Sequence, residues 1–444
     1  MKICAYVQEA YAKVNYKNEC METRQFVGLR VIVDCLERAG YEVEYAGAAT
    51  VHNYDVVLVS LTSDCDWWSF IAERTKWQSG NYKVVIGGAG LLHIAPFLPF
   101  GDFFIFGRGE NLIVPLVRGI ERDGGWAHES VACSKTFSPD RIYKIAQVSE
   151  PYPHKISIGR NRDFREGPIG CNHRYMFCGY TWQRRFVSPD NYYYMQDSLF
   201  GGIAEKERAL LDLHKNLDQV DFSHLRTTSI DGMNERLRRM VNKPITRAVL
   251  LDFLGAMLRY QGKPHQIKLY SIVGYPTETE ADWQEIVDVI GQADRNSALI
   301  DRPWSIVLHC TPFRAMPATP MACEPMSYRN YRGEIGRVLG AGLRGNLIYQ
   351  GRNLWAVESM GTESLPTVIL SAICHRGSSA DTDAIARVSR SHKFWSASTA
   401  VRVATLERYF DVDTLFGRFS PETLPSRYLR TYAKVEKLWG EPFK

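Results

Sequence analysis

The sequence predicts an α/β protein with a parallel sheet at the N-terminus, a second α/β region and a mainly helical C-terminal region. Short apolar runs alternate with helical patterns over residues 1–122 and again over residues 154–325. This alternation is typical of β-α-β units, which build parallel sheets covered by helices. Residues 123–153 are irregular and rich in Gly and Pro, which predicts a linker, and residues 326–444 are mainly helical with loops.

Composition places the chain among globular proteins. At 444 residues it has the length of two or three domains, and 45% hydrophobic with 23% charged residues is ordinary for such folds. A net charge of +5 is slight and does not by itself indicate a nucleic-acid partner. The sequence contains no run of about 18 apolar residues, so no membrane span is predicted. The ten cysteines are scattered along the chain and do not have the spacing of a disulfide framework. This distribution predicts a reducing, cytoplasmic setting.

The N-terminal region reads as successive strands and helices. Residues 2–7 predict a buried first strand, and residues 23–39 predict a helix that ends at Gly40. The remaining strands are expected at 41–45, 54–61, 83–87 and 102–106, and the remaining helices at 67–76 and 111–122.

Polar and glycine-rich turns follow three of these strands. Ligands of parallel sheets lie beyond the carboxyl ends of the strands, where glycine lets a backbone approach a ligand closely. The same glycines would equally serve tight strand-to-helix turns, so both interpretations stay open. The turn residues are Thr62, Ser63, Gly87, Gly88, Gly107, Gly109 and Glu110.

The second region has the pattern of a full or partial (β/α) barrel. Such barrels carry their active face at the carboxyl ends of the strands. Strands are expected at 155–158, 192–195, 225–230, 266–273 and 305–309, and helices at 203–217, 233–241, 247–260 and 280–293.

The segment with the clearest chemical meaning is the loop at residues 170–182, which follows the first barrel strand. It reads Gly-Cys-Asn-His-Arg-Tyr-Met-Phe-Cys-Gly-Tyr-Thr-Trp and places Cys171 and Cys178 in one glycine-flanked loop. Thiolates are the usual ligands of iron–sulfur clusters. The pair alone is equally consistent with two unrelated thiols.

This loop resembles the cluster loop of radical S-adenosylmethionine (SAM) proteins. The pattern of that family is three cysteines separated by three and then two residues, with an aromatic residue before the last. Cys171 and Cys178 take the first and third positions, Phe177 is the aromatic residue, and Tyr175 takes the middle position.

Four further segments are similar to that family and occur in its order. Residues 192–197 resemble a second strand that ends in a polar pair, and residues 231–246 resemble an acidic strand end followed by an Asn-Lys-Pro-Ile-Thr turn. Residues 268–279 resemble the fifth strand with its Gly-x-Pro-x-Glu-Thr loop, and residues 311–320 the loop after the sixth strand. The resemblance implies a cobalamin-binding-type, Rossmann-like domain at residues 1–122 and a radical SAM partial barrel at residues 154–325.

The resemblance implies a [4Fe-4S] cluster, SAM and, from the N-terminal domain, cobalamin bound at the glycine turns. With Tyr175 in the middle, His173 or Tyr175 itself could complete the cluster, a thiolate such as Cys310 could reach in, or no cluster forms. The N-terminal domain lacks the Asp-x-His-x-x-Gly loop that supplies the lower ligand in many cobalamin proteins. The residues implied in SAM binding are Phe177, Gln196, Asp197, Arg226, Asp231, Gly274, Pro276 and Thr311.

Three functions follow as hypotheses. The first is an enzyme that uses SAM for methyl transfer or radical rearrangement, with a flavodoxin or ferredoxin as electron donor. The second is a binding or regulatory protein that kept the fold without the chemistry. The third is a nucleic-acid-modifying factor, suggested by basic residues around Phe394 and Trp395, where interleaved acidic residues favour a solvated helical face instead.

Overall fold

The computed structural model describes most of the N-terminal region, parts of the barrel-like region and most of the C-terminal helices. The described residues are 1–8, 27–64, 66–123, 126–138, 143–157, 163–164, 166, 169–170, 174–179, 182, 227–243, 245–259, 266–297, 305–327, 331, 334–338, 348–349, 352–353 and 365–419.

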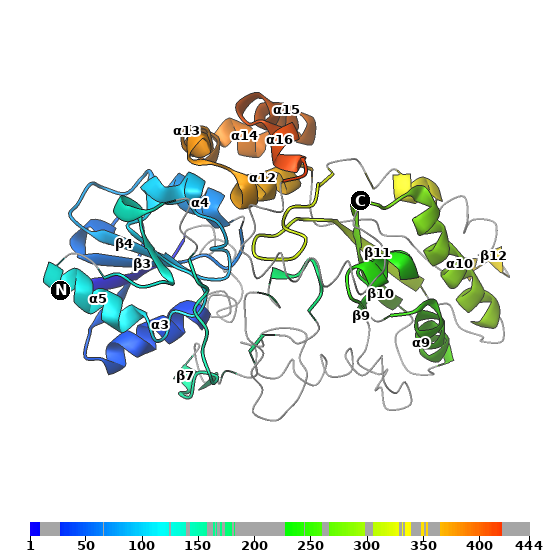
Figure 1. Cartoon of the computed structure of the whole chain (residues 1–444), viewed down its shortest axis with the longest axis horizontal. Coiled ribbons are helices and arrows are strands. Elements are labelled where there is room, and N and C mark those ends of the chain that lie inside the picture. Colours follow the sequence, from blue (N-terminus) through cyan, green and yellow to red (C-terminus); the bar gives the residue numbers. More distant parts are fainter. Residues whose placement is uncertain are drawn as a thin grey trace.

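A six-stranded sheet forms the N-terminal part, in the order β2-β1-β3-β4-β5-β6 (Figure 1). The first five strands pair in parallel, and β6 pairs antiparallel with β5. The predicted linker therefore contributes an edge strand to this sheet. The strands are β1 (Ile3–Tyr6), β2 (Val43–Ala46), β3 (Val56–Ser60), β4 (Lys83–Gly87), β5 (Phe103–Ile105) and β6 (Val131–Cys133).

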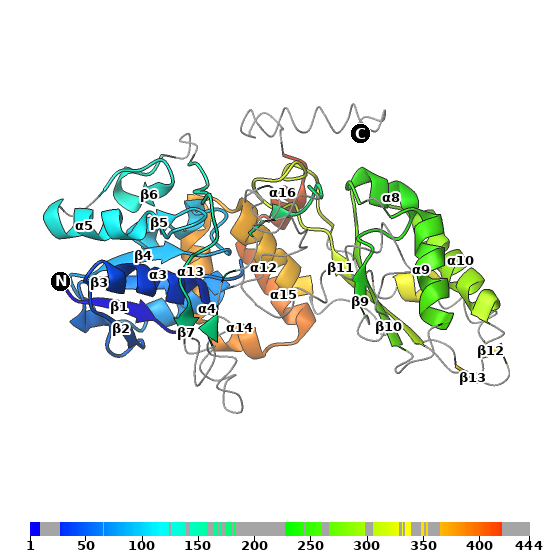
Figure 2. The same cartoon turned by 90° about the horizontal axis from the view of Figure 1, so that it is seen from below.

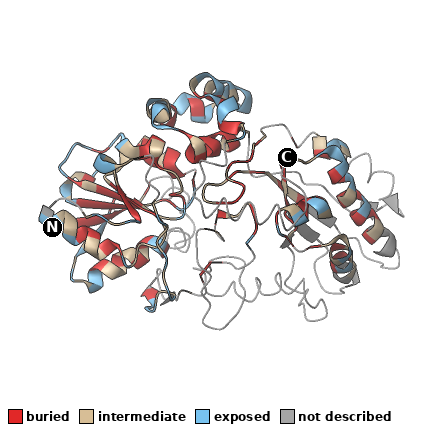
Figure 3. Ribbon diagram, in the orientation of Figure 1, coloured by how far each residue is buried: buried red, intermediate tan, exposed pale blue. Residues whose placement is uncertain are grey.

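Helices cover both faces of this sheet because its strands are apolar on both sides. Along β1, Ile3 and Ala5 belong to the core beneath one face, whereas Cys4 and Tyr6 belong to the core beneath the other. Figure 3 shows the buried strands between their helical layers. The first face packs on α3 (Val27–Arg38) and α5 (Ile113–Asp123), and the second on α4 (Asp66–Arg74) and the 3₁₀ helix η2 (Ala95–Phe100).

The second region contains a three-stranded parallel sheet in the order β11-β10-β9. Its outer face packs on two long helices in a core of its own, built around Trp283 and Leu269. The strand expected at 192–195 and the helix expected at 203–217 lie outside the described residues, so a barrel is not shown. The elements are β9 (Thr227–Ser229), β10 (Gln266–Val273), β11 (Ser305–Pro312), α8 (Glu235–Met240), α9 (Arg247–Arg259) and α10 (Glu280–Ser297).

Residues 365–419 of the C-terminal region are mainly helical. Figures 1 and 2 show α12 (Leu365–Arg376) between the two sheets, with the other C-terminal helices close to α4. No helix among the described residues has the length and apolar character needed to cross a membrane. The other helices are α13 (Thr382–Arg390), α14 (His392–Ser396), α15 (Thr399–Tyr409) and α16 (Val412–Phe416), with the short 3₁₀ helices η1 (Val51–Asn53), η3 (Ser134–Thr136) and η5 (Ser379–Asp381).

Two small antiparallel ribbons complete the described secondary structure. The first begins where the first barrel strand was expected, and the second precedes α12. They are β7 (Ile156–Ser157) with β8 (Asp163–Phe164), and β12 (Ile348–Tyr349) with β13 (Arg352–Asn353).

Candidate functional site

Four segments that are far apart in the sequence meet at the carboxyl edge of the second sheet. The Lys243 ammonium lies 4.4 Å from the centre of the Tyr175 ring and 2.8 Å from Oδ2 of Asp231. The Tyr275 hydroxyl donates to the backbone carbonyl of Asp231 at 2.7 Å, and the Tyr275 ring packs 5.3 Å from that of Phe313. The four segments are the cysteine loop with Tyr175, the acidic segment with Asp231 and Lys243, the Gly-x-Pro loop with Tyr275, and the loop after β11 with Phe313. Four of the five motifs singled out in the sequence therefore form one contact chain, and the fifth, residues 192–197, lies outside the described residues.

The described part of the cysteine loop, residues 174–179, is docked on the turn that ends α8. The Met176 amide donates to the Val241 carbonyl at 3.1 Å, and the Cys178 amide donates to the Tyr175 carbonyl at 3.1 Å. The same carbonyl accepts from Nε1 of Trp182 at 2.8 Å. Tyr175 is buried and Cys178 is half-buried. Cys178 therefore lies on a loop whose backbone is hydrogen-bonded to Val241 on one side and to Trp182 on the other.

Asp231 is held by its own neighbours. Its backbone is left-handed, with φ of 50°, which turns the carboxylate back toward the strand. One oxygen accepts from the Ser229 hydroxyl and the other pairs with Lys243. Burial disfavours the Lys243 charge, but Asp231 and the Tyr175 phenol outweigh burial and raise the pKa of the lysine. Any SAM contact predicted for Asp231 would share oxygens that already have donors.

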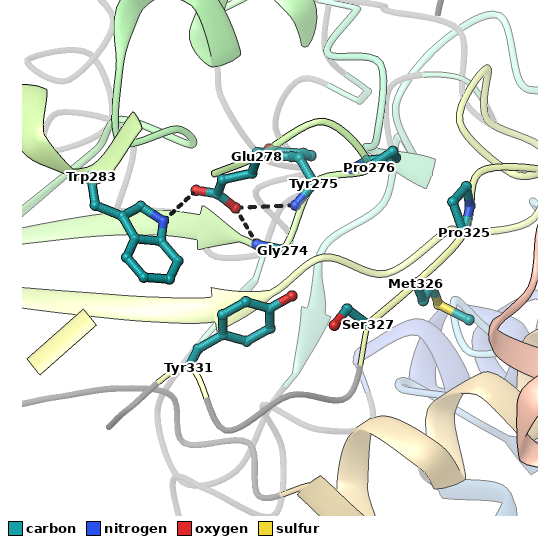
Figure 4. Close-up of a pocket in the computed structure, with 9 residues that line it drawn as sticks. All are labelled: Gly274, Tyr275, Pro276, Glu278, Trp283, Pro325, Met326, Ser327 and Tyr331. Atoms are coloured by element: carbon teal, nitrogen blue, oxygen red, sulfur yellow. Dashed lines mark hydrogen bonds between the residues drawn. The ribbon is translucent and has the colours of Figure 1, made fainter. Parts of the chain in front are cut away.

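A cavity of about 230 Å³ lies beside this chain of contacts (Figure 4). Two of the predicted SAM residues, Gly274 and Pro276, line it. Tyr331 and Ser327 lie across the cavity from Glu278, so the lining combines aromatic surface with a few polar groups. The full lining is Gly274, Tyr275, Pro276, Glu278, Trp283, Pro325, Met326, Ser327 and Tyr331.

Glu278 closes the turn that forms one wall of this cavity. Its carboxyl accepts from the amides of Gly274 and Tyr275, the latter at 3.1 Å, and from Nε1 of Trp283 at 3.0 Å (Figure 4). Burial outweighs these hydrogen bonds and raises the pKa of Glu278 from 4.5 to about 7. The turn is therefore anchored by a carboxyl group that changes charge near neutral pH.

Strand alternation separates the two faces of the second sheet. Cys310 faces the core shared with α9 and α10, and burial strongly raises the pKa of its thiol, so this position disfavours the thiolate that ligates iron. Its neighbours in the strand, His309 and the predicted SAM residue Thr311, face the other way and are half-buried. His309 lies beside Tyr270 of β10, with ring centres 4.7 Å apart. His309 and Tyr270 were not predicted, although the period-two pattern of β10 and β11 would have placed them.

At the carboxyl edge of the N-terminal sheet, the predicted turn residues have protein partners. Oδ2 of Asp66 accepts from the Thr62 amide at 2.7 Å, the Thr62 hydroxyl at 2.8 Å and the Ser63 amide at 2.9 Å. Gly88, with φ of 108°, packs so tightly that a Cβ would lie 2.2 Å from the Leu61 carbonyl oxygen. At Gly87, by contrast, a Cβ would find only ordinary contacts. This turn is shaped by loop-to-loop packing.

The turn after β5 is likewise engaged with protein. A Cβ at Gly107 would lie 2.5 Å from the carbonyl oxygen of Ala146, whereas one at Gly109 would meet a side-chain methyl at 3.0 Å. Arg108 pairs with Glu110 and, at 2.6 Å, with the fully buried side chain of Glu166. These contacts fasten the turn to the chain that leads into the cysteine loop.

Helix α12 lies over the end of β3 and is fastened there by Asp64. Oδ2 of Asp64 accepts from Ser371 and lies 3.1 Å from Nε2 of His375 and 3.2 Å from Arg314. Cys374 donates its thiol to the Asp64 carbonyl at 3.3 Å. Burial alone would raise the pKa of Asp64, but the contacts with His375, Arg314 and Ser371 hold it well below its usual range. One carboxylate thus joins the N-terminal sheet, the loop after β11 and α12.

Several predicted residues cannot be placed. Cys171, His173, Gln196, Asp197 and Arg226 lie outside the described residues. Among the residues that are described, no three His, Cys, Asp or Glu side chains gather as ligands for a metal ion. Phe177 is described and stacks on Tyr175, with ring centres 6.1 Å apart.

The fold and site define a mixed α/β protein with a polar contact chain and a small cavity at the carboxyl edge of its second sheet. No protein-family model and no curated protein match the chain. Two solved structures of OxsB, a cobalamin-dependent S-adenosylmethionine radical enzyme, align with it at low similarity. The apo, selenomethionine-labelled form has 11% identity and a TM-score of 0.26, over 93% of this chain and 58% of OxsB. The form with aqua-cobalamin and S-adenosylmethionine bound has 10% identity and a TM-score of 0.24, over 99% and 61%.

Proposed function

We propose that this chain is a SAM-binding enzyme of the radical SAM type, with its site at the carboxyl edge of β9, β10 and β11. The convergence of Tyr175, Lys243, Asp231 and Tyr275 in one contact chain carries the proposal. These residues come from segments that resemble the family separately, and a shared site is what the resemblance predicts. We base the proposal on these residues and not on the OxsB alignments.

The cavity beside Gly274 is the proposed position of the adenine of SAM. A planar heteroaromatic ring suits a space lined by Pro276, Met326 and Tyr331, with backbone and hydroxyl groups at its rim. Thr311 and Phe177 are the proposed contacts for the rest of the molecule. Methyl transfer and radical rearrangement both remain proposals for the reaction, and the substrate is unassigned.

The proposed cluster ligands are Cys171 and Cys178, and Tyr175 does not fit as a third. Its ring is already engaged within the protein: the buried ammonium of Lys243 lies 4.4 Å from its centre, and the ring stacks on Phe177. When bound, a cluster would supply the electron that cleaves SAM, received from a flavodoxin- or ferredoxin-type donor. The chain's own part is to hold the Cys178 loop and the SAM cavity together.

Cobalamin remains a proposal from the resemblance alone. The turn residues proposed for it have protein partners, and α12 covers the end of β3, so a corrin would require α12 to move. A titration of hydroxocobalamin with the intact chain tests this directly. A change in the corrin absorbance at stoichiometric protein would support binding, and an unchanged spectrum would remove cobalamin from the proposal.

A binding protein without radical chemistry is the second candidate function. The engagement of Tyr175 with Lys243 favours it, because the side chain at the middle ligand position of the cysteine loop is held by a contact within the protein. Such a protein would bind SAM in the same cavity and leave it intact.

Anaerobic reconstitution with iron and sulfide separates the two candidates. The enzyme is expected to take up iron, to show cluster absorbance and paramagnetic resonance signals, and to cleave SAM after chemical reduction. Cys178→Ala should lower the bound iron, whereas Cys133→Ala, at a half-buried cysteine of β6, should not. SAM binding without iron or cleavage would establish the second candidate, and the absence of both would refute the site.

A further inference from the structure

Lys243 occupies a rigid position in the turn after α8. Its amide donates to the Arg238 carbonyl at 2.7 Å, and its own carbonyl accepts from the Ile245 amide at 2.8 Å. The preceding residue, Asn242, has a left-handed backbone with φ of 60°. With 2% of the residue exposed, the ammonium is removed from water and bonded to Asp231 at 2.8 Å. The charge therefore sits at one fixed point.

The Tyr175 ring faces this fixed charge. Its centre is 4.4 Å from the ammonium, within the range of a cation–π contact, and Tyr175 itself is only 6% exposed. Such contacts strengthen when both partners are desolvated. The ring also stacks on Phe177, with planes 13° apart. The Tyr175 ring is therefore held by the Lys243 ammonium and by the Phe177 ring of its own loop.

Hydrogen bonds on both sides of Tyr175 connect this contact to the rest of the loop. Before the ring, Nδ2 of Asn242 donates to the Arg174 carbonyl at 3.3 Å, and after it the Met176 amide donates to Val241. The Cys178 amide then bonds to the Tyr175 carbonyl. The position of Cys178 consequently depends on the position of Tyr175.

We propose that Lys243 is the positioning residue of the cysteine loop. The Lys243 ammonium lies over the Tyr175 ring and anchors the loop at a point where a metal–ligand bond would otherwise anchor it. Loops that supply metal ligands are commonly ordered by the metal itself, because the binding free energy serves as folding free energy. Here contacts with other parts of the protein hold residues 174–178 and so position Cys178. The role of this loop in supplying a metal ligand rests on the proposed function, whereas the contact between Lys243 and Tyr175 is tested on the chain without added metal.

Hydrogen exchange of the metal-free chain tests the anchor, with the Met176 and Cys178 amides as reporters. Tyr175→Leu removes the ring and is expected to speed exchange at both amides by about thirty-fold, the factor that corresponds to a desolvated cation–π contact. Tyr175→Phe keeps the ring and should change both rates by less than about three-fold. Amides of α10 serve as the internal reference for global unfolding.

The cation is tested separately. Lys243→Met alone would bury an unpaired Asp231, so the informative variant is Asp231→Asn with Lys243→Met, since Asn also accepts the left-handed backbone. We expect the same loop-specific gain in exchange and faster alkylation of Cys178 relative to the buried thiol of Cys310. Lys83→Met, which removes a lysine paired with Asp102 in the N-terminal sheet, should alter neither.

Two results would overturn the proposal. The first is an unchanged exchange rate at Met176 and Cys178 in the double variant, whatever the rate in Tyr175→Leu. The second is equal acceleration in Tyr175→Phe and Tyr175→Leu, which would assign the anchoring to the hydroxyl and not to the ring.

Discussion

Glu278 illustrates at the residue scale how burial competes with hydrogen bonding. Three N–H donors favour its charged form, yet burial raises its pKa from 4.5 to about 7. Between these two values the folded chain holds a proton that the unfolded chain has lost. The stabilisation from this proton is complete below about pH 4.5 and is lost as the pH rises through 7.

The predicted consequence is a pH-dependent difference between wild type and Glu278→Gln, which cannot titrate. From pH 5 to pH 8 the free energy of unfolding of wild type should fall relative to that of the variant by at most about 3 kcal/mol. Urea unfolding of both chains across this range measures it. Parallel pH profiles would show that Glu278 has an ordinary pKa.

Tyr175→Cys restores the family's third thiolate at a position beside a fixed ammonium. A neighbouring cation lowers the pKa of a thiol and favours the thiolate that binds iron. We therefore expect the variant to retain more iron per chain after reconstitution than wild type does, by roughly twofold or more if three thiolates complete the site. Iron and sulfide analysis measures this, with Tyr175→Ser as the control for loss of the ring. Equal iron in all three proteins would mean that the loop does not hold a cluster.

At the scale of elements, the turn after β4 offers a matched pair of glycines. Gly88 has positive φ and no room for a Cβ, whereas at Gly87 the nearest atom to a Cβ would be 3.8 Å away. Gly88→Ala should lower the free energy of unfolding by more than about 1 kcal/mol, while Gly87→Ala should leave it unchanged or raise it slightly. Chemical denaturation of the two variants measures the difference. Comparable losses would mean that the tight packing of this turn is not required.

The elements that sequence predicts well are those with a strong local pattern. The strand expected at 266–273 is β10 to the residue, and the helix expected at 247–260 is α9 within one residue, because the strand alternates polar and apolar residues and the helix has apolar residues at helical spacing. The three residues of β6 were assigned to a linker, since so short an edge strand is defined by its pairing with β5 and not by its own pattern.

The site residues divide in the same way, into those that a local sequence pattern marks and those that depend on distant contacts or burial. Motif order placed Asp231, Gly274 and Pro276 where the structure brings segments together, because glycine and proline mark turns that lie at strand ends. Lys243 and Glu278 were not assigned roles, since the importance of Lys243 comes from burial beside Asp231 and the distant Tyr175, and that of Glu278 from burial of its carboxyl group. The Asp64 contacts with α12 are still more distant in sequence and left no local signal.

Asp64 is predicted to be the main polar fastening of α12. Asp64→Ala should lower the free energy of unfolding by about 3 to 5 kcal/mol, because it leaves Arg314 without its buried partner. Glu129→Ala, which breaks an exposed pair with Lys144, should leave the free energy of unfolding nearly unchanged, because solvent screens this pair. Since the folded pKa of Asp64 lies below 3.8, the Asp64→Ala loss should shrink as the pH falls below that value. Urea unfolding at neutral and acidic pH checks both statements, and equal costs for the two variants would contradict them.

At the scale of the whole molecule, the regions are joined by one hydrophobic core. Residues of α4, of the loop after β11 and of α12 belong to a single buried cluster, whereas α9 and α10 pack around Trp283 in another. Trp68 lies at the first of these junctions and donates its Nε1 to the Leu370 carbonyl at 3.4 Å. The N-terminal sheet and the C-terminal helices should therefore open together.

Trp68→Ala tests this coupling, because it removes a fully buried ring from the shared core. Amides of β3 and α12 should lose protection from hydrogen exchange by a similar free energy, about 3 to 5 kcal/mol, while amides of α10 keep theirs. Trp283→Ala is the matched control and should produce the reverse pattern, since its ring belongs to the other core. If α12 kept its protection in Trp68→Ala, the C-terminal helices would be an independent unit, and the closure of α12 over the N-terminal sheet would be a contact between separate bodies.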